Sequence, residues 1–202
     1  MLANGFSLRS RGFVATCVFT CLILLLSAAG LRAREVGGVE LPGQVRVEGS
    51  DVPLVLNGAG VRRKFFFSIY VGALYLPRRT SDAAEAMSMP GPKRVSMTFT
   101  YHEIPAKKLA AAWREGFEEN LDPPEWQHFG ASIRRFWSLF PTLRKGDVVT
   151  IDQSPEYGVV VRLNGRKLGR IGEPGFMSVL LRIWLGRAPV TDSLKRAMLG
   201  DG

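Results

Sequence analysis

The stretch LNGAGVRRKFFFSIYVGALYLP, residues 56–77, contains a strand pattern that runs without a charge over the twelve positions 65–76. One face of this pattern is apolar apart from a terminal tyrosine, and the other face mixes apolar side chains with the hydroxyl groups of Ser68 and Tyr70. Three consecutive cations, at positions 62–64, stand directly before it. Because both faces of the run need cover, the pattern predicts a central strand of a sheet.

Strand and helix patterns alternate along the rest of the chain. Alternating apolar residues predict a second strong strand at 93–101, and apolar residues at helical spacing follow Pro105. The further predicted elements are two short strands in 45–56 around Gly49-Ser50, a turn at Asn57-Gly58, helices at 106–120, 122–140, 177–185 and 192–199, and strands in 146–171 with a hairpin turn at Asn164-Gly165. Asp122 and Thr191 are the predicted caps of the second and the last of these helices. This order predicts an α+β fold, an antiparallel sheet with helices packed on one face.

The first 33 residues have the layout of a secretory signal peptide. Arg9 and Arg11 precede an uncharged run of 20 residues, 12–31, and small residues cluster before and at Ala33. We predict export to the periplasm with cleavage of this leader. The alternative is a retained inner-membrane anchor, because a run of this length can span a bilayer. Residues 34–202 are predicted to form one domain.

Cysteine content and charge narrow the classes of function. Cys17 and Cys21 both lie in the leader, so disulfide bonds, thiol catalysis and cysteine metal sites are excluded for the remainder. The leader holds three of the 27 cations and none of the 18 acids, which leaves a net charge of +6 on the remainder. These cations are scattered, which argues against nucleic acid as a partner and favours an acidic ligand or proximity to an anionic membrane surface.

The common catalytic and cofactor-binding motifs are missing from the sequence. Gly58-Ala59-Gly60 is followed by an arginine at position 63, where a dinucleotide-binding loop needs its third glycine, and by a strand in place of a helix. His102 and His128 stand 26 residues apart in different elements, so surface or interface positions explain them better than a metal site. We therefore predict neither a metal nor a cofactor.

The basic stretch before the strand suggests a paired site. Every second residue of a regular strand shares a face, and one face then carries Arg62, Lys64, Phe66, Ser68 and Tyr70. Arg63 is predicted on the opposite face. Arginine binds carboxylates through two parallel hydrogen bonds, and a tyrosine hydroxyl can donate another. The alternative is that Arg62 points to solvent and that Tyr70 is a core residue with a backbone partner.

Several pieces of the chain together resemble a known family. GAGVR with the long strand ending in ALYL, and the C-terminal pieces RLNGRKLGRI and FMSVLLRIWLGRAPVTDSLKRAMLG, are similar to the bacterial branch of the chalcone isomerase-like family. The resemblance covers nearly all of residues 34–200. It implies an open-faced β-sandwich, in which a large antiparallel sheet is backed by helices and a ligand cleft lies between sheet and helices.

The resemblance also bears on the activity. The family includes plant chalcone isomerases, which close a flavanone ring, and non-catalytic relatives that bind fatty acids. Arg62 matches the family arginine, and Tyr70 stands where the isomerases carry a threonine, as in the fatty-acid-binding relatives. The isomerases also use a tyrosine at the start of the helix after the next strand, and the matching segment here, IPAKKLAAAW, contains none.

Three functions follow as hypotheses. The leading one is an exported, non-catalytic protein that binds a fatty acid or similar amphiphilic carboxylate through residues Arg62, Tyr70, Ser68 and Phe66. The second is an isomerase or intramolecular lyase of chalcone isomerase type on an unknown substrate, with Arg62 stabilising an oxyanion and Tyr70 donating a proton. The third is an envelope structural or assembly partner without a small ligand, which predicts a filled interior between sheet and helices.

Overall fold

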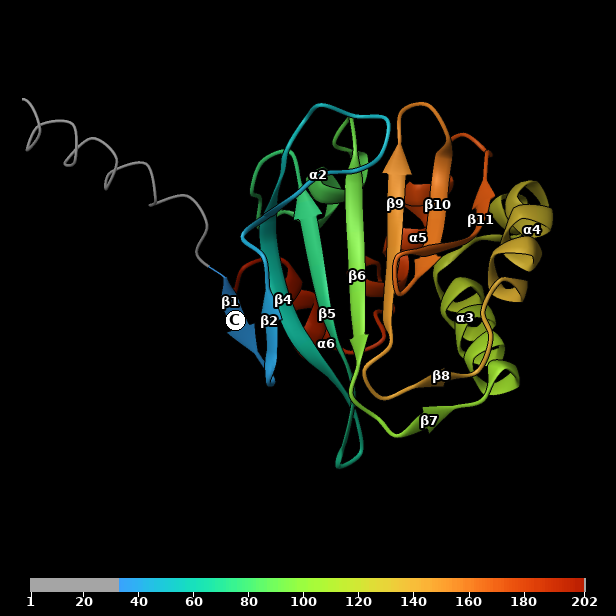
Figure 1. The fold of residues 1–202 in the computed structure, drawn as a ribbon. Helices are drawn as coiled ribbons and strands as arrows, with labels where there is room; N and C mark the ends of the chain where they lie inside the picture. The colour runs from blue at the N-terminus through green and yellow to red at the C-terminus, as the bar shows by residue number, and fades with distance from the viewer. Residues whose placement is uncertain (1–32, 202) are drawn as a thin grey trace, which may run out of the picture.

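A seven-stranded antiparallel sheet organises the chain in the computed structural model, which describes residues 33–201 (Figure 1). Its strand order is β11-β10-β9-β6-β5-β4-β3. The strands are β3 (Gln44–Val45), β4 (Leu54–Lys64), β5 (Phe67–Leu76), β6 (Lys93–Phe99), β9 (Val148–Ser154), β10 (Gly158–Leu163) and β11 (Arg166–Ile171). Two small two-stranded sheets pair β1 (Arg34–Val36) with β2 (Val39–Leu41) and β7 (Glu103–Ile104) with β8 (Leu143–Arg144).

The helices gather on one face of this sheet, as the sequence predicts. They are α2 (Ala83–Ser88), α3 (Ala106–Asn120), α4 (Pro123–Ser138), α5 (Phe176–Leu185) and α6 (Asp192–Met198). Helix α5 is apolar nearly all round and has eight buried residues, because it lies in the main core and is covered by α2 and α3. Helix α4 starts at the predicted cap, where Asp122 and Glu125 form a reciprocal capping box.

The opposite face of β4 and β5 is covered by a second, smaller core. The β1–β2 hairpin and the segment that follows it contribute Leu41 and Val47, which pack with Val71 and Tyr75 of β5. The other side of β5 faces the main core through Tyr70 and its neighbours. The prediction that both faces of this strand are covered is therefore confirmed.

The predicted turn at Asn57-Gly58 is wrong, and the strand predicted over 65–76 begins two residues later, as β5. Positions 57 and 58 lie inside β4, where the register with β5 shifts at a bulge, and the chain instead turns at Phe65–Phe66. The Asn57 side chain is used as a clamp, since its amide donates to the backbone oxygens of Thr80, at 3.0 Å, and Met198, at 2.8 Å.

The glycines of β4 serve packing. A Cβ atom added to Gly58 would lie 2.2 Å from the backbone oxygen of Ala197 in α6, and one added to Gly60 would lie 2.5 Å from the Ala197 Cβ. Glycine at these positions lets the last helix lie directly on the backbone of the strand. The glycine motif is thus explained by close approach of a helix and not by a phosphate group.

The predicted leader, apart from Ala33, lies outside the described residues. Within residues 33–201, none of the helices combines the length and the apolar character that a bilayer crossing requires.

Candidate ligand-binding site

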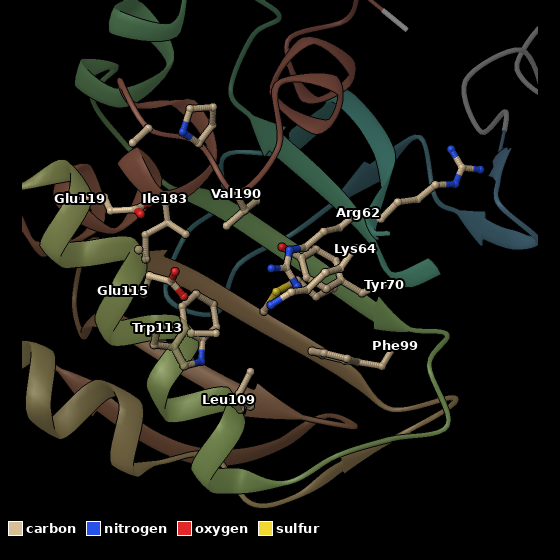
Figure 2. Close-up of a pocket in the computed structure, with 16 residues that line it drawn as sticks. Arg62, Lys64, Tyr70, Phe99, Leu109, Trp113, Glu115, Glu119, Ile183 and Val190 are labelled. Atoms are coloured by element: carbon tan, nitrogen blue, oxygen red, sulfur yellow. The ribbon is translucent and has the colours of Figure 1, made fainter. Parts of the chain in front are cut away.

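A partly open cavity of about 250 Å³ lies between the sheet and helices α3 and α5 (Figure 2). Its lining residues are Arg62, Arg63 and Lys64 of β4, Tyr70 of β5, Met97 and Phe99 of β6, Leu109, Ala112, Trp113, Glu115, Gly116 and Glu119 of α3, Ile183 of α5, and Ala188, Pro189 and Val190. Figure 2 shows Arg62, Lys64 and Tyr70 on the sheet side, facing Trp113 and Leu109 on the helix side. The interior between sheet and helices is therefore not completely filled.

Arg62 and Tyr70 meet as cross-strand partners. They are directly opposite each other in the register of β4 and β5, and the Arg62 guanidinium carbon lies 5.6 Å from the centre of the Tyr70 ring. The sequence placed the two on one face by counting along a single strand. The structure places them together through the hairpin, because paired residues of an antiparallel ladder also share a face.

The Tyr70 hydroxyl is buried and remains free to donate a hydrogen bond. It accepts a hydrogen bond of 2.9 Å from the Trp184 indole Nε1, and no acceptor for its own proton is present among residues 33–201. Burial raises the pKa of Tyr70 above its usual value of 10.0, against the opposing effects of the Arg62 charge and the Trp184 hydrogen bond. The phenol is therefore protonated at neutral pH and presents an O–H group beside a guanidinium.

Two further donors at this cavity are buried and have no hydrogen-bond partner. These donors are Arg62 Nε and Trp113 Nε1. Within the described part of the chain, the Thr100 hydroxyl is the one other buried side-chain polar atom without a hydrogen-bond partner. An unpartnered buried polar group costs about 1–3 kcal/mol, so each such group in a folded protein needs a reason. Both nitrogen donors belong to residues that line the cavity, and an acceptor such as a carboxylate could satisfy them.

The rim of the cavity carries both signs of charge. Arg63 and Lys64 are exposed on β4, and Glu115 and Glu119 are exposed one turn apart on α3. Across residues 33–201, no ion pair links these cations to these acids. Arg63 borders the cavity in spite of the predicted alternation, because the register shifts between Arg62 and Arg63.

Two of the predicted ligand-binding residues do not border the cavity, which corrects the sequence analysis. Phe66 is 99% exposed in the turn between β4 and β5. Ser68 is half-buried and pairs with Arg63, past the register shift that leaves Ile69 as an extra residue on β5. The turn and the bulge break the regular alternation on which the prediction relied.

Sequence reasoning missed the helix side of the site. Trp113 has the helical spacing of a core residue, and its burial fits that reading, but nothing in the spacing indicates that its indole N–H lacks a hydrogen-bond partner or that the residue lines a cavity. Met97 and Phe99 stand on the apolar side of the predicted strand 93–101 and likewise look like ordinary core residues. Their place in the lining depends on how α3 and α5 sit over the sheet.

The remaining polar candidates give no second site of this kind. Within residues 33–201, no cluster of three or more His, Cys, Asp or Glu side chains could hold a metal ion. His128 lies 3.4 Å from a Glu173 carboxylate oxygen on the surface, and His102 is exposed.

Comparisons with known proteins agree with this architecture. The structure is similar to the crystal structure of a fatty-acid binding protein from Arabidopsis thaliana, with a TM-score of 0.64 and 13% sequence identity over 80% of this chain and 92% of that chain. At this identity the similarity concerns the fold. No curated protein matches the chain. A model of the family described as chalcone isomerase-like matches residues 33–200, and the chain therefore belongs to the chalcone isomerase-like family.

Proposed function

We propose that this protein is an exported, non-catalytic binding protein for a fatty acid or a similar amphiphilic carboxylate. The observation that carries the proposal is the pair of buried, unpartnered donors, Arg62 Nε and Trp113 Nε1, beside the free O–H group of Tyr70 in one cavity. The fold shared with a fatty-acid binding protein supports it.

The bound carboxylate is proposed to lie between Arg62 and Tyr70. The guanidinium offers two parallel N–H groups, and the phenol offers a third donor from the neighbouring strand. The apolar part of the ligand would contact Met97, Leu109 and Ile183. Placing a carboxylate here satisfies donors that the ligand-free protein leaves unpaired, so part of the binding free energy comes from removing that cost.

The size of the cavity limits the ligand that it encloses. Small-molecule sites commonly measure about 300–1,000 Å³, and this cavity of about 250 Å³ lies just below that range. A carboxylate with a short or medium tail fits this space best, and a longer tail would extend through the mouth. We therefore expect affinity to increase with tail length, by up to about fourfold per methylene, and then to level off once the cavity is full.

The enzyme hypothesis remains the second candidate, because a guanidinium beside a protonated phenol can also stabilise an oxyanion and donate a proton. The residues of α3 that line the cavity include no tyrosine, in line with the departure from the isomerases that the sequence shows. Steady-state assays with hydroxychalcones separate the two functions. Turnover that is lost in Arg62→Ala would replace the binding proposal by an isomerase.

The ligand itself is best identified from the protein as cells produce it. Native mass spectrometry of the chain recovered from the periplasmic fraction would report both a co-purified ligand and the mass of the N-terminus, which tests export and cleavage together. Calorimetric titration with straight-chain carboxylates from hexanoate to hexadecanoate would follow. A protein without bound ligand and without affinity for any member of the series would contradict the proposal and would favour a structural partner.

A further inference from the structure

The turn between β4 and β5 exposes an unusual cluster of aromatic side chains. Phe65, Phe66 and Phe67 are 85%, 99% and 56% exposed. Val52, two residues before β4, is the one other large apolar residue that is exposed among residues 33–201. Figure 1 shows the β4–β5 hairpin reaching beyond the end of the sheet, so the phenylalanines form a projecting aromatic tip. Three adjacent exposed phenyl rings favour an interaction surface over an ordinary turn.

The backbone of this turn also departs from what turns prefer. Phe65 has a positive φ of 55°, a conformation that bulky residues rarely adopt. The β10–β11 hairpin of the same sheet has Asn164 and Gly165 at its turn, with φ of 50° and 79°, which is the residue pair that such turns favour. The aromatic tip therefore places phenylalanine where glycine or asparagine would be more stable, and strain of this kind is typical of functional segments.

Positive charge surrounds the aromatic tip. Arg63 and Lys64 precede it and are exposed. The ring centroids of Phe67 and Tyr101 are 5.6 Å apart, and the backbone N–H of the exposed Lys145 donates a hydrogen bond to the backbone oxygen of His102, next to Tyr101. In the part of the chain that the structure describes, Arg63, Lys64 and Lys145 have no ion-pair partner.

Two acids at this end of the sheet already have partners, whereas Glu115 and Glu119 of α3, on the cavity rim, take part in no ion pair among residues 33–201. Glu103 pairs with Arg144 at 3.2 Å, and the Asp147 carboxylate accepts hydrogen bonds from the backbone of Arg144 and the side chain of Asn164. The end of the sheet around the aromatic tip thus combines apolar rings, a half-buried tyrosine and unpaired cations. Apolar rings that enter the acyl boundary, with cations at the headgroup level, are the arrangement that binds an anionic bilayer surface.

We propose that the aromatic tip docks the protein on an anionic lipid bilayer, with Phe65 and Phe66 inserted at the interface and Arg63, Lys64 and Lys145 against the lipid headgroups. Because Arg63 and Lys64 also border the cavity, docking brings its mouth to the lipid surface. The docking rests on the aromatic tip and these three cations and does not depend on what the cavity binds.

A probe in the tip itself tests the proposal independently of any contribution from residues 1–32. Phe66→Trp places an indole in the turn, whereas all four native tryptophans of the chain lie in α3, α4 and α5. The probe is titrated with vesicles of phosphatidylcholine and phosphatidylglycerol that contain brominated lipid, and with phosphatidylcholine vesicles as the neutral control. We expect quenching of Phe66→Trp that the wild type does not show, and stronger association with the acidic vesicles.

Second substitutions in the Phe66→Trp background measure separately how the phenyl rings, the charge near the tip and the net charge of the protein contribute to vesicle association. Phe65→Gly relieves the positive φ, so the fold should be at least as stable, yet loss of the ring should weaken vesicle association by about tenfold. Lys64→Glu should weaken association with acidic vesicles. Arg170→Glu makes the same charge change at an exposed position towards the opposite end of the sheet, and Val52→Ser removes the other exposed apolar side chain; both should leave association unchanged.

Three results would overturn the proposal. The first is absence of tip quenching in both kinds of vesicle. The second is equal weakening by Lys64→Glu and Arg170→Glu, which would indicate attraction by net charge without a docking site. The third is concentration-dependent self-association in ultracentrifugation that Phe65→Gly abolishes while vesicles have no effect on the probe, which would assign the aromatic tip to a contact between copies of this chain.

Discussion

Removing the guanidinium of Arg62 should change ligand affinity and protein stability in opposite directions. Arg62→Met keeps an unbranched apolar stem over the Tyr70 ring and removes the charged group. In the complex, that group is proposed to hold the ligand carboxylate. In the ligand-free protein, the Nε of this guanidinium is buried without a hydrogen-bond partner and therefore lowers the stability of the fold.

The two magnitudes can be worked out from the structure. Loss of a charge-assisted pair with a buried carboxylate costs about 2–4 kcal/mol, which weakens binding about thirtyfold to about a thousandfold. An unpartnered buried Nε costs the free protein about 1–3 kcal/mol, whereas the contact of Arg62 with the Tyr70 ring, at 5.6 Å, returns about 0.5–1 kcal/mol. Ligand-free Arg62→Met should therefore be more stable by about 1 kcal/mol, or about 2–4 °C in Tm.

The assay combines calorimetric titration with octanoate and thermal unfolding without ligand. Arg63→Met is the matched control, since Arg63 is an exposed neighbour and its loss should change either free energy by less than about 0.5 kcal/mol. Arg62→Lys should not restore full affinity, because a single ammonium cannot provide two parallel hydrogen bonds.

Two results would refute this reasoning. Equal losses of affinity in Arg62→Met and Arg63→Met would show that a diffuse basic patch attracts the anion. A marked loss of stability in ligand-free Arg62→Met would show that the guanidinium stabilises the fold and does not wait unpaired for a ligand.

Three further predictions concern stability. Gly58→Ala should lower the stability by about 3 kcal/mol, because its Cβ would overlap the Ala197 backbone oxygen at 2.2 Å, whereas Gly172→Ala meets nothing within 4 Å and should unfold in urea like the wild type. Glu125→Gln should lower the free energy of unfolding by about 0.5–1 kcal/mol at neutral pH. The hydrogen bond from Arg182 lowers the pKa of Glu125 below 4.5, so the contribution of the Glu125 carboxylate to stability is lost as pH falls through its pKa in the folded state. Urea unfolding at several pH values should therefore show the stabilities of wild type and variant converging in acid. Burial lowers the pKa of Lys93 below 10.5, so the unfolded chain binds more protons between the two values, and the stability of the wild type relative to Lys93→Met should rise with pH across that window. A difference in stability between wild type and Lys93→Met that does not change with pH would contradict this last prediction.

The predicted fold class is correct because most elements carry their own local signals. The cap at Asp122, the cap at Thr191 and the turn at Asn164-Gly165 all appear where the sequence placed them. The β4–β5 hairpin was not predicted, because here the local signals are misleading. Its turn is Phe65–Phe66, which has no turn chemistry, while Asn57-Gly58 has that chemistry and lies within a strand.

Only part of the candidate site could be predicted. Arg62 and Tyr70 were selected because a cation and a phenol near one apolar strand suggest carboxylate binding, and the structure brings both to the cavity. Ser68 and Phe66 were misplaced because a bulge and a turn cannot be recognised from alternation alone. The role of Trp113 depends on the packing of α3 against the sheet, which sequence spacing does not specify.

The contact of α6 with the glycines of β4 has a consequence for how the chain folds. The Asn57 amide and the Met198 oxygen that it binds are 141 residues apart, and the backbone around Ala197 completes the cover of the strand that carries Arg62. Closing a loop of this length costs about 4 kcal/mol of chain entropy before any contact compensates for it, and such distant contacts form slowly. A nascent chain therefore cannot complete the cover of β4 until α6 has left the ribosome. For a protein that we propose to be exported, this late closure would keep the chain open for translocation and would make the ligand site one of the last parts to be assembled.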